Sequence, residues 1–133
     1  MLTSMTLSIS IVRKPEEVYA FVSNVRNLPK WAPAFCKSVQ PAGSEWIVET
    51  PDGPVTLSMT QKNPMGILDH HVVFSSGGNV FVPMRVVPNE SGSEVLFTLF
   101  RQPSMPDEKF TGDIQLVRRD LASLKRVLEA EPS

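Results

Sequence analysis

The sequence predicts an α+β fold in which a curved antiparallel sheet of seven strands wraps around one long C-terminal helix. Three observations predict it. Short segments with alternating apolar and polar residues, separated by turns rich in Pro and Gly, fill most of the chain. Two short helical segments follow the first strand, and the last segment changes to a helical period.

The N-terminal part of the chain is predicted to form one strand and two short helices. In residues 5–13, leucine and isoleucine alternate with threonine and serine, which is typical of a half-buried strand. Pro15 and the two acidic residues after it suit the first turn of a helix, predicted from Pro15 to about Asn24. Two prolines limit the next helical segment, residues 27–33, to one or two turns.

Six further strands are predicted to follow as an antiparallel meander. The turn signals between them include Pro51-Asp52-Gly53-Pro54 and the Ser- and Gly-rich run at 75–79. The predicted strands are Phe35–Val39, Glu45–Glu49, Val55–Gln61, Ile67–Phe74, Val80–Val87 and Glu94–Arg101.

The C-terminal segment carries one apolar stripe at helical spacing. Its members are Phe110, Ile114, Val117, Leu121, Leu124 and Leu128. The pattern predicts a helix from Met105 to Glu129, roughly 35 Å long, with Ser104 as its cap and charged residues such as Asp113 and Asp120 on solvated faces. Only the sheet offers a surface broad enough for this stripe. A curved sheet that grips one helix tends to leave a space between them, so an apolar ligand cavity is predicted there.

Length and composition indicate the class of protein. A chain of 133 residues, 41% of them hydrophobic, predicts a single domain over residues 1–133 with a sizeable core. The net charge of −1 argues against a nucleic-acid partner. No apolar run is long enough to span a membrane, and the N-terminus lacks the features of a secretory signal, so a cytoplasmic location is predicted. The single cysteine, Cys36, is predicted to be a small buried hydrophobe, and no metal site or cofactor is predicted.

His70 and His71 are the only histidines. Adjacent residues of a strand point to opposite faces, which argues against a shared metal site. The residues that alternate with His70 are bulkier and carry no charge, so His70 is predicted to point inward and His71 outward. An inward imidazole could hydrogen-bond a ligand carbonyl or act as a general base, and a histidine satisfied by its neighbours is the alternative.

Other candidate site residues are arginine, aromatic and methionine side chains. Arg85 could anchor a carboxylate or enolate oxygen from inside the cavity, but alternation along its strand favours a solvated outer face. Large aromatic and methionine side chains suit either a pocket wall or an ordinary core. The predicted ligand-binding residues are Trp31, Phe35, Met59, His70, Phe74, Met84, Phe110, Ile114 and Val117.

Two segments carry a resemblance to a known superfamily. The run Ile11–Val22, with Pro15 leading into Val18-Tyr19-Ala20-Phe21, and the run Asn27–Trp31 resemble the START-like (SRPBCC) helix-grip superfamily, which contains the polyketide cyclase/dehydrase and lipid-transport group. Gly66–Val72 and Asp120–Lys125 also resemble small bacterial members. The resemblance implies the helix-grip fold. It says little about function, because the superfamily includes lipid carriers, hormone receptors, aromatase/cyclases, chaperone activators and oxygenase domains.

Three functions are therefore expected in turn. The first is binding or transport of a small hydrophobic ligand, such as a lipid, an aromatic or a polyketide-like compound, without catalysis. The second is an enzyme like the polyketide cyclases, in which the cavity folds a reactive chain and His70 or Arg85 assists an aldol step. The third is a protein-interaction module or homodimer that uses Ile67, Val73 and Val87 on the outer face of the sheet.

Overall fold

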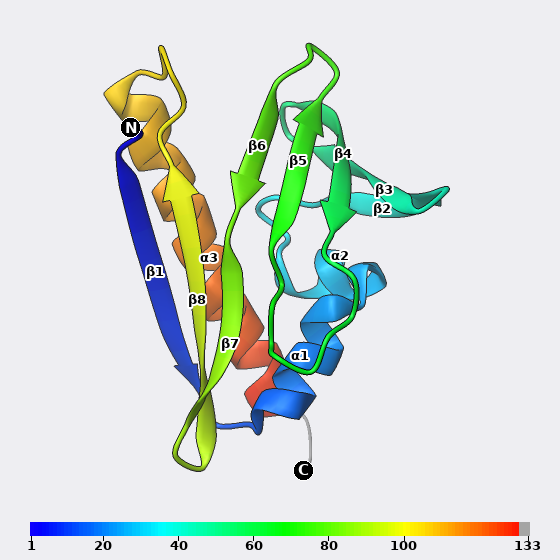
Figure 1. Cartoon of the computed structure of the whole chain (residues 1–133), viewed down its shortest axis with the longest axis vertical. Helices are drawn as coiled ribbons and strands as arrows, with labels where there is room; N and C mark the ends of the chain where they lie inside the picture. The colour runs from blue at the N-terminus through cyan, green and yellow to red at the C-terminus, as the bar shows by residue number, and fades with distance from the viewer. Residues whose placement is uncertain (131–133) are drawn as a thin grey trace.

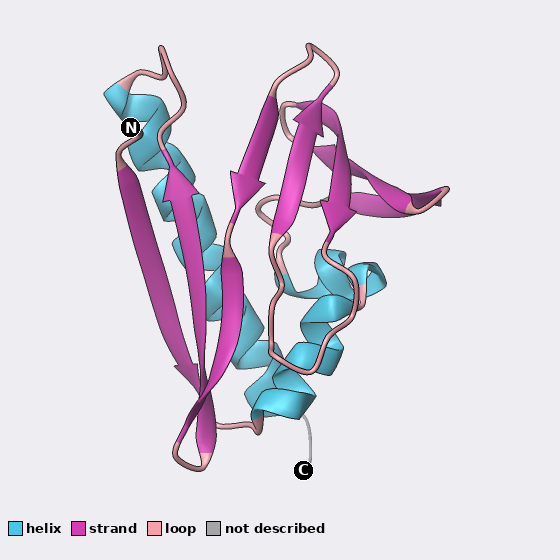
Figure 2. Cartoon of the chain, in the orientation of Figure 1, coloured by secondary structure: helices cyan, strands magenta, loops and turns pink. Residues whose placement is uncertain are grey.

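The structure, a computed structural model, describes residues 1–130 and has the predicted α+β architecture (Figures 1 and 2). The helices are α1 (Pro15–Ser23), the 3-10 turn η1 (Val25–Asn27), α2 (Leu28–Trp31) and α3 (Asp107–Ala130). The strands are β1 (Ser4–Ile11), β2 (Ser38–Ala42), β3 (Glu45–Thr50), β4 (Gly53–Met59), β5 (His70–Phe74), β6 (Asn79–Val82), β7 (Met84–Asn89) and β8 (Gly92–Phe100). No helix in the described part is long and apolar enough to cross a membrane.

The strands form two antiparallel sheets, with orders β1-β8-β7 and β2-β3-β4-β5-β6, so eight strands replace the predicted seven. The difference arises at Pro83, which divides the predicted strand Val80–Val87 into β6 and β7. Proline has no N–H to donate to a ladder, and the next amide, Met84 N–H, donates to Asp69 Oδ1 at 2.9 Å. As a result β6 pairs with β5 while β7 pairs with β8.

Most other predicted elements form close to their expected bounds. The helix predicted from Pro15 is α1, which buries Val18 and Val22 and ends at Ser23. The proline-limited segment gives a single turn, α2. The strand predicted from Phe35 begins only at Ser38, and the strand predicted from Ile67 begins at His70.

The start of the long helix differs from the prediction. α3 begins at Asp107, and Ser104 lies three residues earlier with a left-handed φ of 66°. The prediction that Ser104 caps the helix is therefore wrong. Phe110 N–H donates a hydrogen bond to Pro106 O at 3.2 Å. The carbonyl just before α3 therefore accepts the first helical hydrogen bond.

α3 lies along the sheet and contacts β1 and α2 (Figure 1). The two halves of its apolar stripe are in different surroundings. Leu121, Leu124 and Leu128 are buried in the core, whereas Phe110 and Val117 are only half-buried. The N-terminal half of the helix therefore keeps part of its apolar face uncovered by the protein's own side chains.

Candidate functional site

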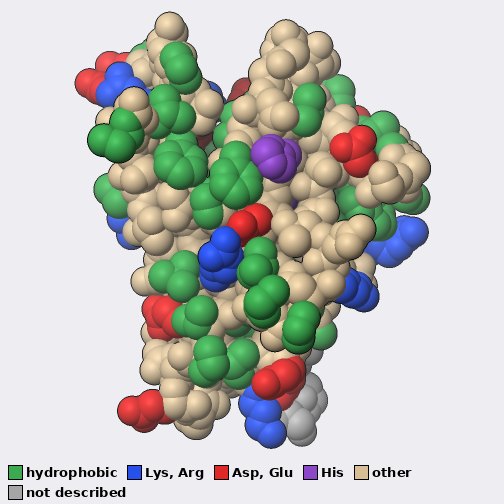
Figure 3. Space-filling model, viewed as in Figure 1, with side chains coloured by type: hydrophobic (Ala, Val, Ile, Leu, Met, Phe, Trp, Pro, Cys, Tyr) green, Lys and Arg blue, Asp and Glu red, His purple; other side chains and the backbone are tan. Residues whose placement is uncertain are grey.

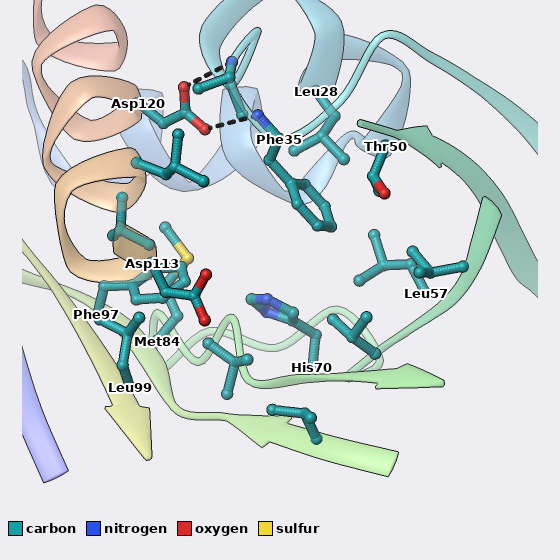
Figure 4. A pocket seen from close by; sticks show the side chains of 18 of the residues that line it. Leu28, Phe35, Thr50, Leu57, His70, Met84, Phe97, Leu99, Asp113 and Asp120 are labelled. Carbon is teal, nitrogen blue, oxygen red and sulfur yellow. Dashed lines mark hydrogen bonds between the residues drawn. The ribbon is translucent and has the colours of Figure 1, made fainter. Parts of the chain in front are cut away.

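A cavity of about 530 Å³ lies between the N-terminal half of α3 and the sheet (Figure 4). This volume falls within the range of small-molecule sites. Most of its wall is apolar and comes from α2, the strands β4 to β8 and α3. Apolar lining residues include Leu28, Trp31, Phe35, Leu57, Met59, Val72, Met84, Phe97, Leu99, Phe110 and Val117.

The cavity exists because the two sheets separate beyond Pro83. β7 pairs with β8 only as far as the Met84–Phe97 pair, and the next amide, Thr98 N–H, donates to Pro83 O at 2.9 Å. Leu99 and Phe100 come after this point, and both line the cavity. Figure 3 shows that the surface is hollowed between the two sheets on this side of the molecule.

Eight of the nine predicted ligand-binding residues line the cavity, and Ile114 does not. Ile114 packs against the core, as Val117 also does, but it lies outside the cavity lining. At 100° per residue, the lining positions of α3 centre on the side of the stripe toward Asp113 and Val117, and Ile114 lies on the opposite edge. The side of α3 that faces the cavity is therefore rotated away from the centre of the apolar stripe, and the stripe alone does not predict it.

Arg85 lies outside the cavity, on the exposed outer face that the alternation of its strand favoured, so the alternative of a cavity group that assists an aldol step is wrong. Its Nη2 lies 2.7 Å from Asp69 Oδ2 and its Nε 3.2 Å from Asp69 Oδ1, with 45% of the side chain exposed. Burial would raise the pKa of Asp69, but hydrogen bonds from Arg85 and the Met84 amide hold that pKa below its usual value. Alternation explains the outcome, since Met84 and Val86 on either side are buried.

The predicted orientation of the two histidines is confirmed. His70 lines the cavity, and Figure 4 shows its ring pointing into it. Its Nδ1 lies 3.0 Å from Leu68 O, and its ring meets Phe97 edge-on with centroids 6.0 Å apart. Burial lowers the pKa of His70, although the Leu68 carbonyl and Asp69 oppose the shift. His71 is exposed, and its Nδ1 forms a hydrogen bond with Asn79 Oδ1 at 3.0 Å.

Asp120 lines the cavity, although its charge predicted a position on a solvated face of the helix. It is buried, and its carboxylate oxygens accept the N–H groups of Ala34 at 3.0 Å and Phe35 at 3.2 Å. Burial raises the pKa of Asp120, and these two amides oppose the shift. No local pattern marks this contact, because Ala34 and Phe35 lie more than eighty residues before Asp120 in the chain.

Asp113 and Lys109 form a charged group on the α3 side of the cavity. Lys109 Nζ lies 2.8 Å from Asp113 Oδ1 and 3.7 Å from Asp52 Oδ2. The hydrogen bond that Lys109 donates to Asp113 is the main cause of the raised pKa of Lys109. Figure 4 shows the Asp113 carboxylate reaching from α3 toward His70. Among residues 1–130, no group of three His, Cys, Asp or Glu side chains is arranged to hold a metal ion.

Cys36 is buried, as the sequence predicted. Burial, together with the charge of Asp120, raises the pKa of the Cys36 thiol to about 11. We expect the native protein to resist modification by 5,5′-dithiobis(2-nitrobenzoate) at about pH 8, because only the thiolate reacts. The same protein in guanidinium chloride is expected to react fully.

Ser44→Cys, in the exposed turn between β2 and β3, provides the control for this experiment. Its added thiol is expected to react quickly in the folded protein. If native Cys36 reacted as quickly as the thiol at position 44, the described burial of Cys36 would be contradicted.

The outer face of the sheet carries the residues considered for association. Val87 is 36% exposed, whereas Ile67 and Val73 are half-buried. Met5, Phe74 and Phe81 are slightly more exposed than Val87, and Phe74 and Phe81 also line the cavity. The predicted trio is therefore only partly accessible, and homodimer formation stays a prediction.

Several solved structures resemble this chain. Protein XoxI from Bacillus cereus matches at 19% identity with a TM-score of 0.78, covering 98% of this chain and 100% of that one. The Aha1 dimer from Colwellia psychrerythraea matches at 18% identity with a TM-score of 0.78, covering 99% of this chain and 100% of that one. The di-domain ARO/CYC protein BexL, from the BE-7585A biosynthetic pathway, matches at 17% identity with a TM-score of 0.78, covering 96% of this chain and 47% of that one. These likenesses show a shared fold.

The family of the chain is identified from its sequence. None of the curated proteins matches the chain. The model of the family described as polyketide cyclase / dehydrase and lipid transport matches residues 3–129. This match covers nearly the whole chain, including α1, the cavity strands and α3. The chain therefore belongs to the polyketide cyclase/dehydrase and lipid transport family.

Proposed function

We propose that this chain binds a small hydrophobic molecule, of lipid, aromatic or polyketide type, in the cavity beneath α3. The observation that carries the proposal is the cavity of about 530 Å³ with a mostly apolar wall. The family description, which names both cyclases and lipid transport, supports it. In this proposal the two sheets and α3 act as a rigid shell, and the space where the sheets separate admits the ligand.

Burial of apolar surface supplies the affinity. Each Å² of apolar surface removed from water contributes roughly 25 cal/mol, and both the ligand and the uncovered face of α3 lose contact with water on binding. Phe110 and Val117 of α3 and Leu57 and Val72 of the sheet all line the cavity, so a flat or chain-like molecule inside it contacts apolar side chains of both the helix and the sheet. Such a site selects its ligands mainly by their shape and their apolar surface.

Val117→Trp tests the proposal by filling the cavity. The larger side chain projects from α3 into the space the ligand needs, so we expect binding of the neutral probe 1-methoxypyrene to weaken at least about tenfold, the loss of roughly one ring's burial. Isothermal titration calorimetry measures the affinity, and thermal unfolding verifies that the variant is folded.

Arg118→Trp adds the same bulk at the next residue of α3, which is exposed and outside the cavity, and it should bind the probe as the wild type does. Equal affinity in both variants would contradict the proposal, and so would a wild-type protein that binds no apolar probe. Native mass spectrometry of the protein purified from cells should show added mass that Val117→Trp reduces.

A second candidate function is cyclisation of a polyketide chain, which the position of His70 favours. Its imidazole is the one neutral base among the described cavity residues. In such a step His70 takes a proton from the carbon between two carbonyls, that carbon bonds to a second carbonyl carbon, and the new alkoxide regains a proton. His70→Ala should abolish turnover of a poly-β-ketone thioester. If wild type and buffer give the same products, this candidate is excluded.

A further inference from the structure

The hydrogen bonding of His70 fixes what this residue offers a ligand. Its Nδ1 lies 3.0 Å from Leu68 O, and a carbonyl oxygen can only accept, so Nδ1 carries the proton. Burial holds the pKa of His70 below its ordinary value, which keeps the ring neutral at pH 7. In a neutral ring with Nδ1 protonated, Nε2 is an unprotonated acceptor. No described residue donates to it, and the ring points into the cavity (Figure 4).

Most of the charged side chains around the cavity are carboxylates. Asp52, Asp113 and Asp120 line it, against a single ammonium group, Lys109, and no arginine. Lys109 already contacts both Asp113 and Asp52. The oxygens of Asp120 are engaged by the Ala34 and Phe35 amides. A carboxylate ligand would thus enter a site of negative charge with no free cation to replace its lost hydration, which is costly.

We propose that the cavity selects uncharged apolar molecules that donate a hydroxyl or N–H proton to Nε2 of His70, and that it rejects fatty acids and other carboxylates. This inference rests on the proposed function and narrows it to one ligand chemistry. A neutral alcohol or phenol satisfies the open acceptor of His70 and covers the apolar wall with the rest of its surface. An anion gains the same apolar contact but leaves Nε2 without a donor.

Three probes with one ring system test the proposal. They are 1-hydroxypyrene, 1-methoxypyrene and 1-pyrenecarboxylate, which are a donor, a neutral compound without a donor, and an anion. We expect the wild type to bind 1-hydroxypyrene about tenfold more tightly than 1-methoxypyrene, the effect of one hydrogen bond, and 1-pyrenecarboxylate more weakly than either. In His70→Phe the hydroxyl and methoxy probes should bind equally, with the methoxy affinity close to that of the wild type.

The outcomes separate this inference from the proposed function. If 1-methoxypyrene binds and Val117→Trp blocks it, but the hydroxyl gives no advantage or the carboxylate binds best, only the ligand class is refuted. A hydroxyl preference that persists in His70→Phe also refutes it. If no probe binds the wild type, the proposed function and this inference fall together.

Nitrogen NMR of the wild type gives a second measurement that does not depend on a variant folding. In protein labelled with ¹⁵N-histidine, the cavity residue His70 is expected to be the neutral Nδ1–H form at pH 7, and addition of 1-hydroxypyrene should shift its Nε2 resonance while the exposed His71 stays unchanged. A His70 ring protonated on Nε2, or a Nε2 resonance insensitive to the bound probe, would overturn the inference.

Discussion

Replacement of Gly66 by alanine is expected to cost more than about 3 kcal/mol of unfolding free energy. Gly66 has a φ of 72°, in the left-handed region, and an added Cβ would lie 2.3 Å from Val86 O and 3.2 Å from Val86 Cγ1. The carbonyl of Gly66 also accepts the Val86 N–H at 3.0 Å, so the loop cannot move away without losing this bond. Chemical denaturation of the variant and the wild type measures the loss.

Gly43→Ala separates the two causes of this loss. Gly43 has a similar φ of 64°, but nothing lies within 4 Å of an added Cβ. Its replacement should therefore cost only the backbone strain, about 1 kcal/mol. If the two variants lost equal stability, the close approach of Gly66 to β7 would be contradicted.

The loop around Gly66 also affects the site. Asn63 holds it together, since its Oδ1 accepts the N–H groups of Met65 and Ile67, each at 3.0 Å. The chain leaves this loop directly into Leu68, whose carbonyl orients the His70 ring, and Leu68 N–H donates to Met84 O at 2.8 Å. A shift of the loop would therefore reach the one imidazole of the cavity.

Local periodicity was sufficient to predict most of the fold. The alternation in β1 and the three-and-four spacing in α3 each report which side of an element meets the core, and both were correct. The strand break at Pro83 could not be predicted because the alternation of buried residues continues across it, from Val82 to Met84 and Val86. What changes there is the hydrogen-bonding partner, β5 before the proline and β8 after it, and that depends on strands distant in sequence.

The same limit explains which site residues were found. His70 was placed correctly because strand alternation is a two-way choice that its neighbours decide. Asp120 was missed because its partners, Ala34 and Phe35, lie more than eighty residues earlier in the chain. An apolar pattern also cannot show which core-packed residues border a cavity. Ile114 and Val117 look equivalent in sequence and both pack against the core, but only Val117 lines the cavity.

Asp120→Ala is expected to lower the unfolding free energy by about 1–3 kcal/mol, the cost of leaving a part-buried backbone N–H without its acceptor. Ala34 N–H loses its acceptor, whereas Phe35 N–H keeps a bond to Ala32 O at 3.1 Å. Asp113→Ala is the matched control on the same helix, because it removes a carboxylate whose bond is to the exposed Lys109, worth about 0.5 kcal/mol. Both variants gain the same helix propensity, so chemical denaturation isolates the buried hydrogen bonds.

The effect of Asp120→Ala should also depend on pH with a defined sign. Burial raises the pKa of Asp120 above its ordinary value of 3.8, so the folded chain binds this proton more tightly than the unfolded chain. The carboxyl then contributes stability that is fully present below that ordinary value and is lost as pH rises through the raised pKa. The alanine variant lacks this group, so the difference in unfolding free energy between wild type and variant should widen as pH falls from neutrality toward the ordinary pKa of aspartate. A difference that shrinks over this range would mean that the charged form is the one the fold prefers, and the burial of Asp120 against the segment after α2 would have to be reconsidered.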